Sequence, residues 1–133
     1  MTRPDEPIFY IDESIASKIL IAALRKAGAV IRCVGEDLPK GSLDEVWLRM
    51  CGQQGFIALF RDRKIRYRKI EKDALLEFGV GAFGFNAGQA TGQQTADRVV
   101  SLLPKFKQHI LDTPKPFLFT FGLAGPIAKV KLR

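Results

Sequence analysis

Short apolar segments that favour β-strands alternate with helical segments along the first hundred residues of this 133-residue chain. The expected strands span residues 7–12, 29–34, 56–60 and 80–85, and helices are expected in the intervals between them. Parallel strands need a crossover connection, usually a helix, so this alternation predicts βαβ units. We therefore expect an α/β fold with a central, mostly parallel sheet and helices on both faces. Its central strands are expected to contain residues 9–11, 31–34 and 57–60.

Capping residues and helical spacing mark the first two helices. Ser14 is expected to cap the first helix and Gly28 to end it. Four apolar side chains should share one face of that helix: Ile15, Ile19, Ala22 and Ala23. The sequence Ser-Leu-Asp-Glu over residues 42–45 fits a capping box that opens the second helix. Four residues at helical spacing in that helix are expected to face the core: Leu43, Val46, Trp47 and Met50.

The second half of the chain contains two more predicted helices, over residues 70–78 and 95–111. A break or kink is expected at Pro104, because proline lacks the amide donor and its ring clashes with the preceding turn. Residues 116–121 and 127–132 are expected to form a terminal hairpin or two edge strands. No linker, repeat or low-complexity segment divides the chain, so residues 1–133 are expected to form a single domain.

The chain is strongly basic, with 21 Lys and Arg against 14 Asp and Glu and a formal net charge of +7. Such a charge attracts polyanions, including nucleic acids, anionic membranes and acidic proteins. No apolar run approaches the roughly 20 residues of a membrane-spanning helix, and the N-terminus does not resemble a signal peptide. Cys33 and Cys51 are isolated in apolar stretches, so we expect reduced core thiols and a cytoplasmic protein without membrane association.

Two aspartates follow predicted buried strands: Asp12 ends the first strand and Asp62 comes directly after the third. In open α/β sheets ligands bind beyond the carboxyl ends of the strands, where side chains from separate strands converge. Asp44, in the first turn of the second helix, is expected at the same edge. Three converging carboxylates repel each other unless a cation joins them, and Mg²⁺ or Mn²⁺ suits such oxygen ligands. One or two such ions can activate a water and stabilise charge on a phosphodiester.

Structural roles are the alternatives for these acids. Asp44 could only complement the helix dipole, and Glu45 could only complete the capping box. Asp62 lies between two arginines and could be an ion-paired surface residue. Glu13 could help to start the first helix. An aspartate directly after an apolar strand is less easily explained in this way, and the chain has two of them.

A cationic stretch begins at the second of these aspartates. Residues 61–72 contain seven cations and two acids, with a tyrosine between them. Guanidinium groups bind phosphates and tyrosine stacks on unpaired bases, which predicts RNA binding. The expected RNA-binding residues are Arg61, Arg63, Arg66, Tyr67, Arg68 and Lys69. Lys64 could instead act in catalysis, as a fixed cation near the scissile phosphate. The alternative is a solvated loop with no ligand.

Four segments, taken in order, resemble the PIN-like domains, specifically the toxins of bacterial or archaeal (VapC-like) toxin–antitoxin pairs. They are residues 9–14 (Phe-Tyr-Ile-Asp-Glu-Ser), 42–47 (Ser-Leu-Asp-Glu-Val-Trp), 60–64 (Phe-Arg-Asp-Arg-Lys) and 79–83 (Gly-Val-Gly-Ala-Phe). The resemblance covers nearly the whole chain. It implies a Rossmann-like fold with a central parallel sheet and an acidic, divalent-metal site that cuts RNA.

The resemblance also assigns site residues. By position, the family's metal-binding acids fall on Asp12, Asp44 and Asp62, with Glu13 and Glu45 as adjacent candidates. It therefore implies an endoribonuclease dependent on Mg²⁺ or Mn²⁺, the toxin of a pair whose small antitoxin is its partner. The chain departs from the fuller family pattern, because Arg63 and Lys64 stand where a fourth acid is expected. The sequence does not decide whether the protein forms a homo-oligomer, which stays a possibility.

Two other functions stay open at this point. A PIN-like protein without the fourth acid could bind nucleic acid or a partner without cutting. A phosphoacceptor receiver domain also places acids after its first strand and an Asp after its third. Against a receiver, Asp62 is crowded by cations, and the candidate lysines, Lys129 and Lys131, lie in the terminal strand pair rather than directly after a fifth strand.

Overall fold

The computed structural model describes residues 6–33, 35–36, 38–39, 41, 43–62 and 65–132, with residues 65–71 described by their backbone alone. Helices and strands alternate along this part of the chain, as the sequence predicts. The predicted α/β class is confirmed. None of the helices in the described residues is long and apolar enough to span a bilayer.

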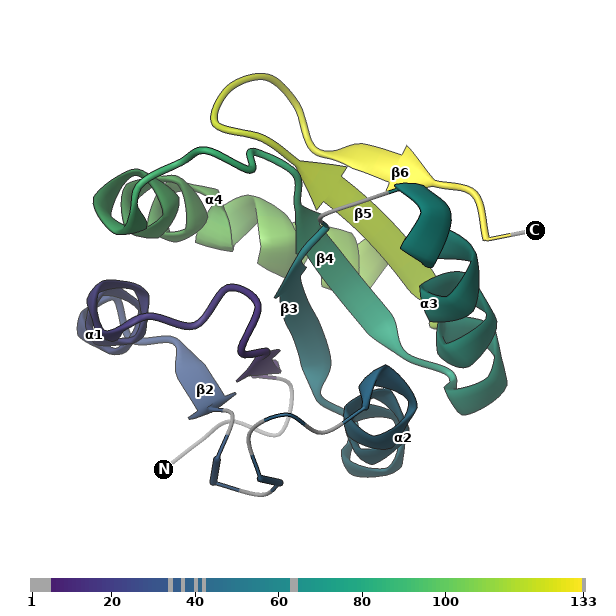
Figure 1. Ribbon diagram of the computed structural model, residues 1–133. Coiled ribbons are helices and arrows are strands. Elements are labelled where there is room, and N and C mark those ends of the chain that lie inside the picture. Colours follow the sequence, from purple (N-terminus) through teal and green to yellow (C-terminus); the bar gives the residue numbers. More distant parts are fainter. Residues whose placement is uncertain are drawn as a thin grey trace.

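Six strands form one sheet in the order β2-β1-β3-β4-β5-β6 (Figure 1). Their bounds are β1 (Ile8–Ile11), β2 (Val30–Cys33), β3 (Ile57–Arg61), β4 (Gly81–Phe85), β5 (Phe117–Phe121) and β6 (Ala128–Val130). Strands β1 to β5 are parallel, and β6 pairs antiparallel with β5. The mostly parallel sheet and the terminal hairpin are therefore confirmed.

The second strand lies at the edge of the sheet, whereas the sequence analysis placed it in the centre. Strand β2 pairs with β1 alone among the described strands, and β3 occupies the other side of β1. Only the last residue of β2 is buried, whereas β3 and β4 are buried along nearly their whole length. An apolar run of this length is thus compatible with a half-buried edge strand.

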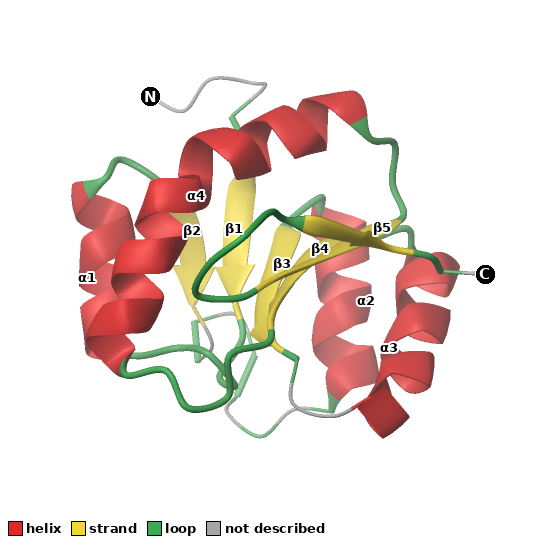
Figure 2. Ribbon diagram, turned by 90° about the horizontal axis from the view of Figure 1, so that it is seen from above, coloured by secondary structure: helices red, strands yellow, loops and turns green. Residues whose placement is uncertain are grey.

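Four helices cover both faces of the sheet, as predicted (Figure 2). They are α1 (Lys18–Lys26), α2 (Asp44–Gln54), α3 (Ile65–Phe78) and α4 (Gly92–Asp112). Side chains alternate between the faces along each strand. In β1, Phe9 and Ile11 pack in the core under α1 and α4, while Tyr10 packs in the core under α2 and α3.

The first helix begins later than predicted. Ser17, not Ser14, is its N-cap, and the Ser17 Oγ accepts a hydrogen bond from the Leu20 amide at 3.1 Å. Ser14 lies in the turn after β1. Because the helix starts three residues further on, its buried stripe also changes and contains Leu20 and Leu24. Two residues predicted on that stripe are exposed: Ile19 and Ala22.

The second helix differs from the prediction in its start and its buried face. Leu43 is its N-cap and makes no side-chain capping bond, and Ser42, the predicted capping residue, lies outside the described residues. Leu43 and Val46 are 73% and 44% exposed, although both were expected to face the core. Trp47 is buried as predicted, together with Leu48 and Cys51. The buried face of α2 is therefore shifted by about one residue position from the face predicted from the sequence.

The fourth helix begins at Gly92, before the predicted start. A capping box begins it: the Thr91 Oγ accepts from the Gln94 amide at 3.1 Å, and the Gln94 side chain accepts from the Thr91 amide at 2.9 Å. One helix continues across Pro104, so no break occurs there. Leu103 and Phe106 on either side of the proline are buried against the sheet, which stabilises the helix across it.

Candidate active site

The strand order reverses at the carboxyl ends of β1 and β3, the place that open α/β sheets use as a ligand-binding crevice. The chain leaves β1 towards β2 on one side and returns through α2 to β3 on the other side. Ligands of open α/β sheets bind at such a reversal. Asp12 follows β1 and donates its amide to the Leu59 carbonyl at 3.0 Å, and Asp62 follows β3 and donates its amide to the Phe85 carbonyl at 2.8 Å. Backbone pairing thus fixes both predicted aspartates at this crevice.

Asp12 is a buried acid, with 8% of its surface exposed. Its Oδ2 accepts a hydrogen bond from the Ser14 amide at 3.1 Å. Burial raises the pKa of Asp12 above its ordinary value, hydrogen bonds from the Ser14 hydroxyl and amide oppose the rise, and the nearby charge of Asp44 adds to it. A bound cation would offset both the desolvation and the repulsion between the two carboxylates.

Asp44 is the first residue of α2 and lies on the surface. Its Oδ1 accepts a hydrogen bond from the Trp47 Nε1 at 3.0 Å. The Trp47 ring is buried, with its centroid 5.7 Å from the Tyr10 ring and 6.3 Å from the Phe60 ring. The indole therefore connects the Asp44 carboxylate to the core beneath α2. Sequence reasoning placed Trp47 in the core but missed this contact, which the spacing of three residues on a helix allows.

Ser14 and Arg61 join the ends of β1, β3 and β4. The Ser14 Oγ accepts from the Arg61 amide at 3.0 Å, and the Arg61 Nε donates to the Ser14 carbonyl at 3.2 Å. The Arg61 Nη1 donates to the Ala87 carbonyl at 3.1 Å, and the guanidinium lies over the Phe85 ring, 5.4 Å from its centroid. Arg61, predicted to bind RNA, thus has a structural role in holding three segments of this edge together.

Asp62 lies at the end of the neighbouring strand. A Cβ atom at Gly84 of β4 would come 3.3 Å from the Asp62 Cβ, so the glycine leaves room beside this aspartate. Within the described part of the chain, no three His, Cys, Asp or Glu side chains form a group that could hold a metal ion. In the structure the charge of Asp44 lies near enough to Asp12 to raise its pKa, and Asp62 lies at the adjacent strand end.

The two neighbouring glutamates are exposed. The Glu13 Oε1 accepts from the Gly41 amide at 2.9 Å, which ties the loop after β2 to the turn after β1. Gly41 has a φ of +84°, a conformation that favours glycine. Glu45 follows Asp44 in the first turn of α2. Neither glutamate forms a ligand group with the two aspartates in the described residues.

Comparison with known proteins identifies the family. The model of a family described as PIN like domain matches residues 7–87. This chain belongs to the PIN-like domain family. The matched segment runs from the start of β1 past the end of β4 and contains the three aspartates of the crevice. The resemblance predicted from the sequence is confirmed, and the receiver-domain alternative is set aside.

A curated protein is similar to most of the length of this chain. A Mycobacterium tuberculosis (strain ATCC 25618 / H37Rv) protein named "Putative ribonuclease VapC45" is 24% identical over 115 residues, which cover 84% of this chain and 83% of the relative. No solved structure matches the chain. The aligned relative thus extends over most of this PIN-like protein, beyond the segment matched by the family model.

The cationic stretch of this PIN-like protein begins next to the crevice. Helix α3 starts three residues after Asp62, so residues from 65 onward are helical rather than the solvated loop considered as an alternative. Arg63 and Lys64 lie outside the described residues. The side chains of residues 66–69, which include two arginines, a tyrosine and a lysine, are also outside the description. Their role in RNA binding stays a prediction.

Asn86 is a polar residue at the same edge that sequence reasoning missed. It directly follows β4, is exposed, and donates its amide to the Phe121 carbonyl at 2.9 Å. A Cβ atom at Gly122 would come 3.0 Å from the Asn86 Oδ1, so this side chain lies against the turn after β5. The sequence feature that could have identified Asn86 is its position directly after a buried strand, the same feature that identified Asp12 and Asp62.

Proposed function

We propose that this PIN-like protein is a metal-dependent endoribonuclease and the toxin of a toxin–antitoxin pair. The observation that carries the proposal is the buried carboxylate of Asp12, with the charge of Asp44 near enough to raise its pKa, at the end of the sheet where the strand order reverses. Membership of the PIN-like family and similarity to a protein named as a ribonuclease support this reaction class.

Mg²⁺ or Mn²⁺ fits these residues. Mg²⁺ is commonly held by one or two carboxylates, with waters and substrate phosphates completing its coordination. The pair of Asp12 and Asp44 is a donor set of this kind, and Asp62 is the proposed third ligand. Glu13 and Glu45 are additional candidates through bridging waters. When bound, the ion supplies a positive charge that activates a water and stabilises the transition state at phosphorus.

The protein's own groups are proposed to position the RNA. Arg63, Arg66, Arg68 and Lys69 would bind phosphates along the start of α3, and Tyr67 would stack on an unpaired base. Lys64 would face the developing charge on the scissile phosphate. Arg61 would act indirectly, because it holds the turn after β1 against the end of β3.

An RNA cleavage assay with Mg²⁺, Mn²⁺ or EDTA tests the proposal. We expect cleavage with either metal, none with EDTA, and none for Asp12→Asn. Asp112→Asn is a matched control, since Asp112 lies at the far end of α4 and contacts Gln108. Cleavage that persists in EDTA or in Asp12→Asn would show that the activity does not come from this site.

The proposed partner is a small antitoxin that inhibits the nuclease in the cytoplasm. A basic ribonuclease threatens the RNA of its own cell unless something covers it, and the net charge of +7 favours an inhibitor with acidic segments. Purification from the native host should recover a small protein bound to this chain. A protein that is always recovered free, and is harmless when overproduced, would contradict the pairing.

A second candidate function is nucleic-acid or partner binding without cleavage. The observation that favours it is the absence of an acid just after Asp62, where Arg63 and Lys64 stand. In this case RNA would bind in EDTA as well as in Mg²⁺, and no products would form under either condition. Asp12→Asn would then leave RNA affinity unchanged or improve it, because it removes a negative charge.

A further inference from the structure

Three neighbouring strands of the sheet are each followed directly by a polar residue. Asp12 follows β1, Asp62 follows β3, and Asn86 follows β4, the next strand in the sheet. Side chains alternate between the faces of a strand, so each should share the face of the residue two positions before it. In β1 and β3 those earlier residues pack in the core under α2 and α3. Asn86 therefore continues the row of the two aspartates, on the face where Asp44 begins α2.

Two glycines agree with this placement of Asn86. A Cβ atom at Gly84 would come 3.3 Å from the Asp62 Cβ, and a Cβ atom at Gly122 would come 3.0 Å from the Asn86 Oδ1. Gly84 pairs in register with Thr120, so Gly122, two positions later, belongs to the same face. The Asn86 side chain thus lies between the end of β3 and the turn after β5, with its Oδ1 towards that turn.

The turn beside Asn86 is held in place by an arginine. The Arg98 Nε donates to the Gly122 carbonyl at 2.8 Å, and its Nη2 donates to the Gly125 carbonyl at 2.6 Å. The Asn86 amide donates to the Phe121 carbonyl at 2.9 Å. In the part of the chain that the structure describes, no hydrogen bond engages the side-chain amide of Asn86. Because Oδ1 lies against the turn, the amino group of this side chain is available to an acceptor.

We propose that Asn86 binds the RNA, with its side-chain amino group donating to a phosphate oxygen next to the scissile phosphate. Asparagine is among the side chains that contact phosphates in nucleic-acid complexes. Of the three residues in the row, only Asn86 can donate a hydrogen bond when the acids are ionised. The inference rests on the proposed function in taking RNA as the ligand of this edge.

The distance along the edge favours a phosphate contact over metal ligation. Neighbouring strands lie about 4.8 Å apart, so the end of β4 is two spacings, about 10 Å, from the end of β1. An ion held by Asp12 and Asp44 is therefore further from Asn86 than from Asp62. A chain of RNA whose scissile phosphate lies at that ion would place another phosphate near the end of β4.

Binding and cleavage by Asn86 variants test the inference. A fluorescent pool of single-stranded RNA of random sequence would be titrated in EDTA to give Kd, and cleaved with Mn²⁺ under single-turnover conditions. Asn86→Ala should raise Kd and the half-saturating RNA concentration about tenfold, the effect of one hydrogen bond to a charged group. The rate at saturating RNA and the Mn²⁺ affinity should stay near those of wild type. Asn86→Asp should bind at least as weakly as Asn86→Ala, because a negative charge replaces the donor.

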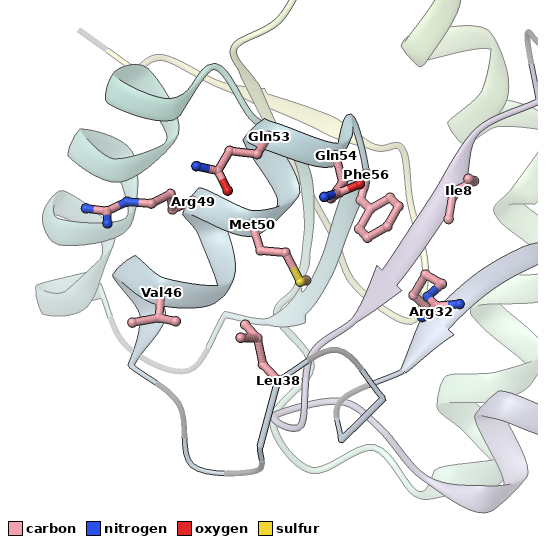
Figure 3. A pocket seen from close by; sticks show the side chains of 9 residues that line it. All are labelled: Ile8, Arg32, Leu38, Val46, Arg49, Met50, Gln53, Gln54 and Phe56. Atoms are coloured by element: carbon pink, nitrogen blue, oxygen red, sulfur yellow. The ribbon is translucent and has the colours of Figure 1, made fainter.

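Gly122→Ala tests the placement of the side chain, because it displaces Asn86 without removing the donor. It should weaken RNA binding in wild type but not further in Asn86→Ala. Gln53→Ala is the matched control, since it removes another exposed side-chain amide. Gln53 lines a groove of about 640 Å³ whose described lining comes from β1, β2, α2 and the adjoining loops (Figure 3). RNA should bind this control as it binds wild type, and circular dichroism should show every variant folded.

The outcomes separate this inference from the proposed nuclease. Cleavage by wild type with unchanged RNA affinity in Asn86→Ala, or with an equal loss in Gln53→Ala, would overturn the inference and leave the nuclease intact. Weaker Mn²⁺ binding in Asn86→Ala would overturn it in favour of a metal ligand. Binding that depends on Asn86 without cleavage by wild type would support it and contradict the nuclease. A wild type that binds no RNA would overturn both.

Discussion

At the scale of single residues, burial and the neighbouring charge of Asp44 both disfavour the ionised form of Asp12. The carboxylate is almost enclosed and faces Asp44, and both effects raise its pKa. Two hydrogen bonds from Ser14 oppose this rise and hold the carboxylate in place. The ionised carboxylate is destabilised in the metal-free protein, and a bound cation would remove this destabilisation. Such a local cost is typical of residues that bind a ligand.

Asp12→Asn should therefore leave the metal-free protein at least as stable as wild type at neutral pH. Because the pKa of Asp12 is raised in the folded state, ionisation of this group lowers the free energy of unfolding as the pH rises above 3.8, the ordinary Asp value. The advantage of the variant should vanish as the pH falls towards that value. Mn²⁺ should stabilise wild type by about 2.7 kcal/mol at a hundred times its Kd, and should not stabilise the variant. Urea unfolding at several pH values measures both effects, and a variant clearly less stable than wild type at pH 7 would contradict the account.

Ser14→Ala tests the positioning of Asp12. The variant removes the acceptor for the Arg61 amide, which should cost about 1–3 kcal/mol, and removes a hydrogen bond that lowers the pKa of Asp12. The acid limb of the pH profile of cleavage should therefore move to higher pH. Ser101→Ala is the control, because the exposed Ser101 hydroxyl donates to the Arg98 carbonyl of its own helix, away from the candidate site. An unchanged profile in Ser14→Ala would leave Ser14 with a structural role only.

At the scale of elements, strands are easier to predict here than helix ends. Buried parallel strands are short apolar runs, and the runs ending at Asp12 and Phe60 are unmistakable in the sequence. Helix starts depend on which of several capping residues is used. Ser14 and Ser17 compete for the first helix, and Ser14 is already engaged by Arg61. That tertiary contact cannot be read from local sequence.

The contact between α2 and α3 gives a prediction at this scale. A Cβ atom at Gly52 of α2 would come 2.3 Å from the Phe78 carbonyl oxygen at the end of α3, so Gly52→Ala requires the helices to separate. This overpacking should cost about 1–3 kcal/mol, more than alanine gains in helix propensity. Gly88→Ala is the control, since nothing lies within 4 Å of its Cβ position. Thermal unfolding compares the two, and equal midpoints would show that the helices are not in close contact at Gly52.

At the scale of the whole molecule, the order of the strands assembles the candidate site. Asp12 and Asp62 were predictable at one edge because both follow parallel strands. The pairing of Asp44 with Trp47 and of Ser14 with Arg61 was not, because these contacts depend on how α2 and the loops pack on the sheet. Sequence reasoning therefore located the crevice and its acids, and missed the residues that hold them.

The basic charge of the molecule predicts a salt-dependent interaction with RNA. Arg66→Ala and Arg68→Ala should each weaken RNA affinity, mainly at low salt, and reduce the slope of log affinity against log salt by about 0.7 for a single strand. Lys64→Ala should instead slow single-turnover cleavage at saturating RNA, because a cation near the scissile phosphate acts in the transition state. If affinity and slope are unchanged in all three variants, RNA binds elsewhere.

The most direct test of the central claim is Mn²⁺ binding followed by the fluorescence of Trp47. This residue is the only tryptophan of the chain, and its indole bonds to the Asp44 carboxylate, so a paramagnetic ion held there should quench it. The account predicts saturable quenching in wild type, its reversal by excess Mg²⁺, and its loss in Asp12→Asn, with Asp112→Asn unchanged. Quenching that is absent in wild type, or equally strong in Asp12→Asn, would contradict a metal site built on Asp12 and Asp44.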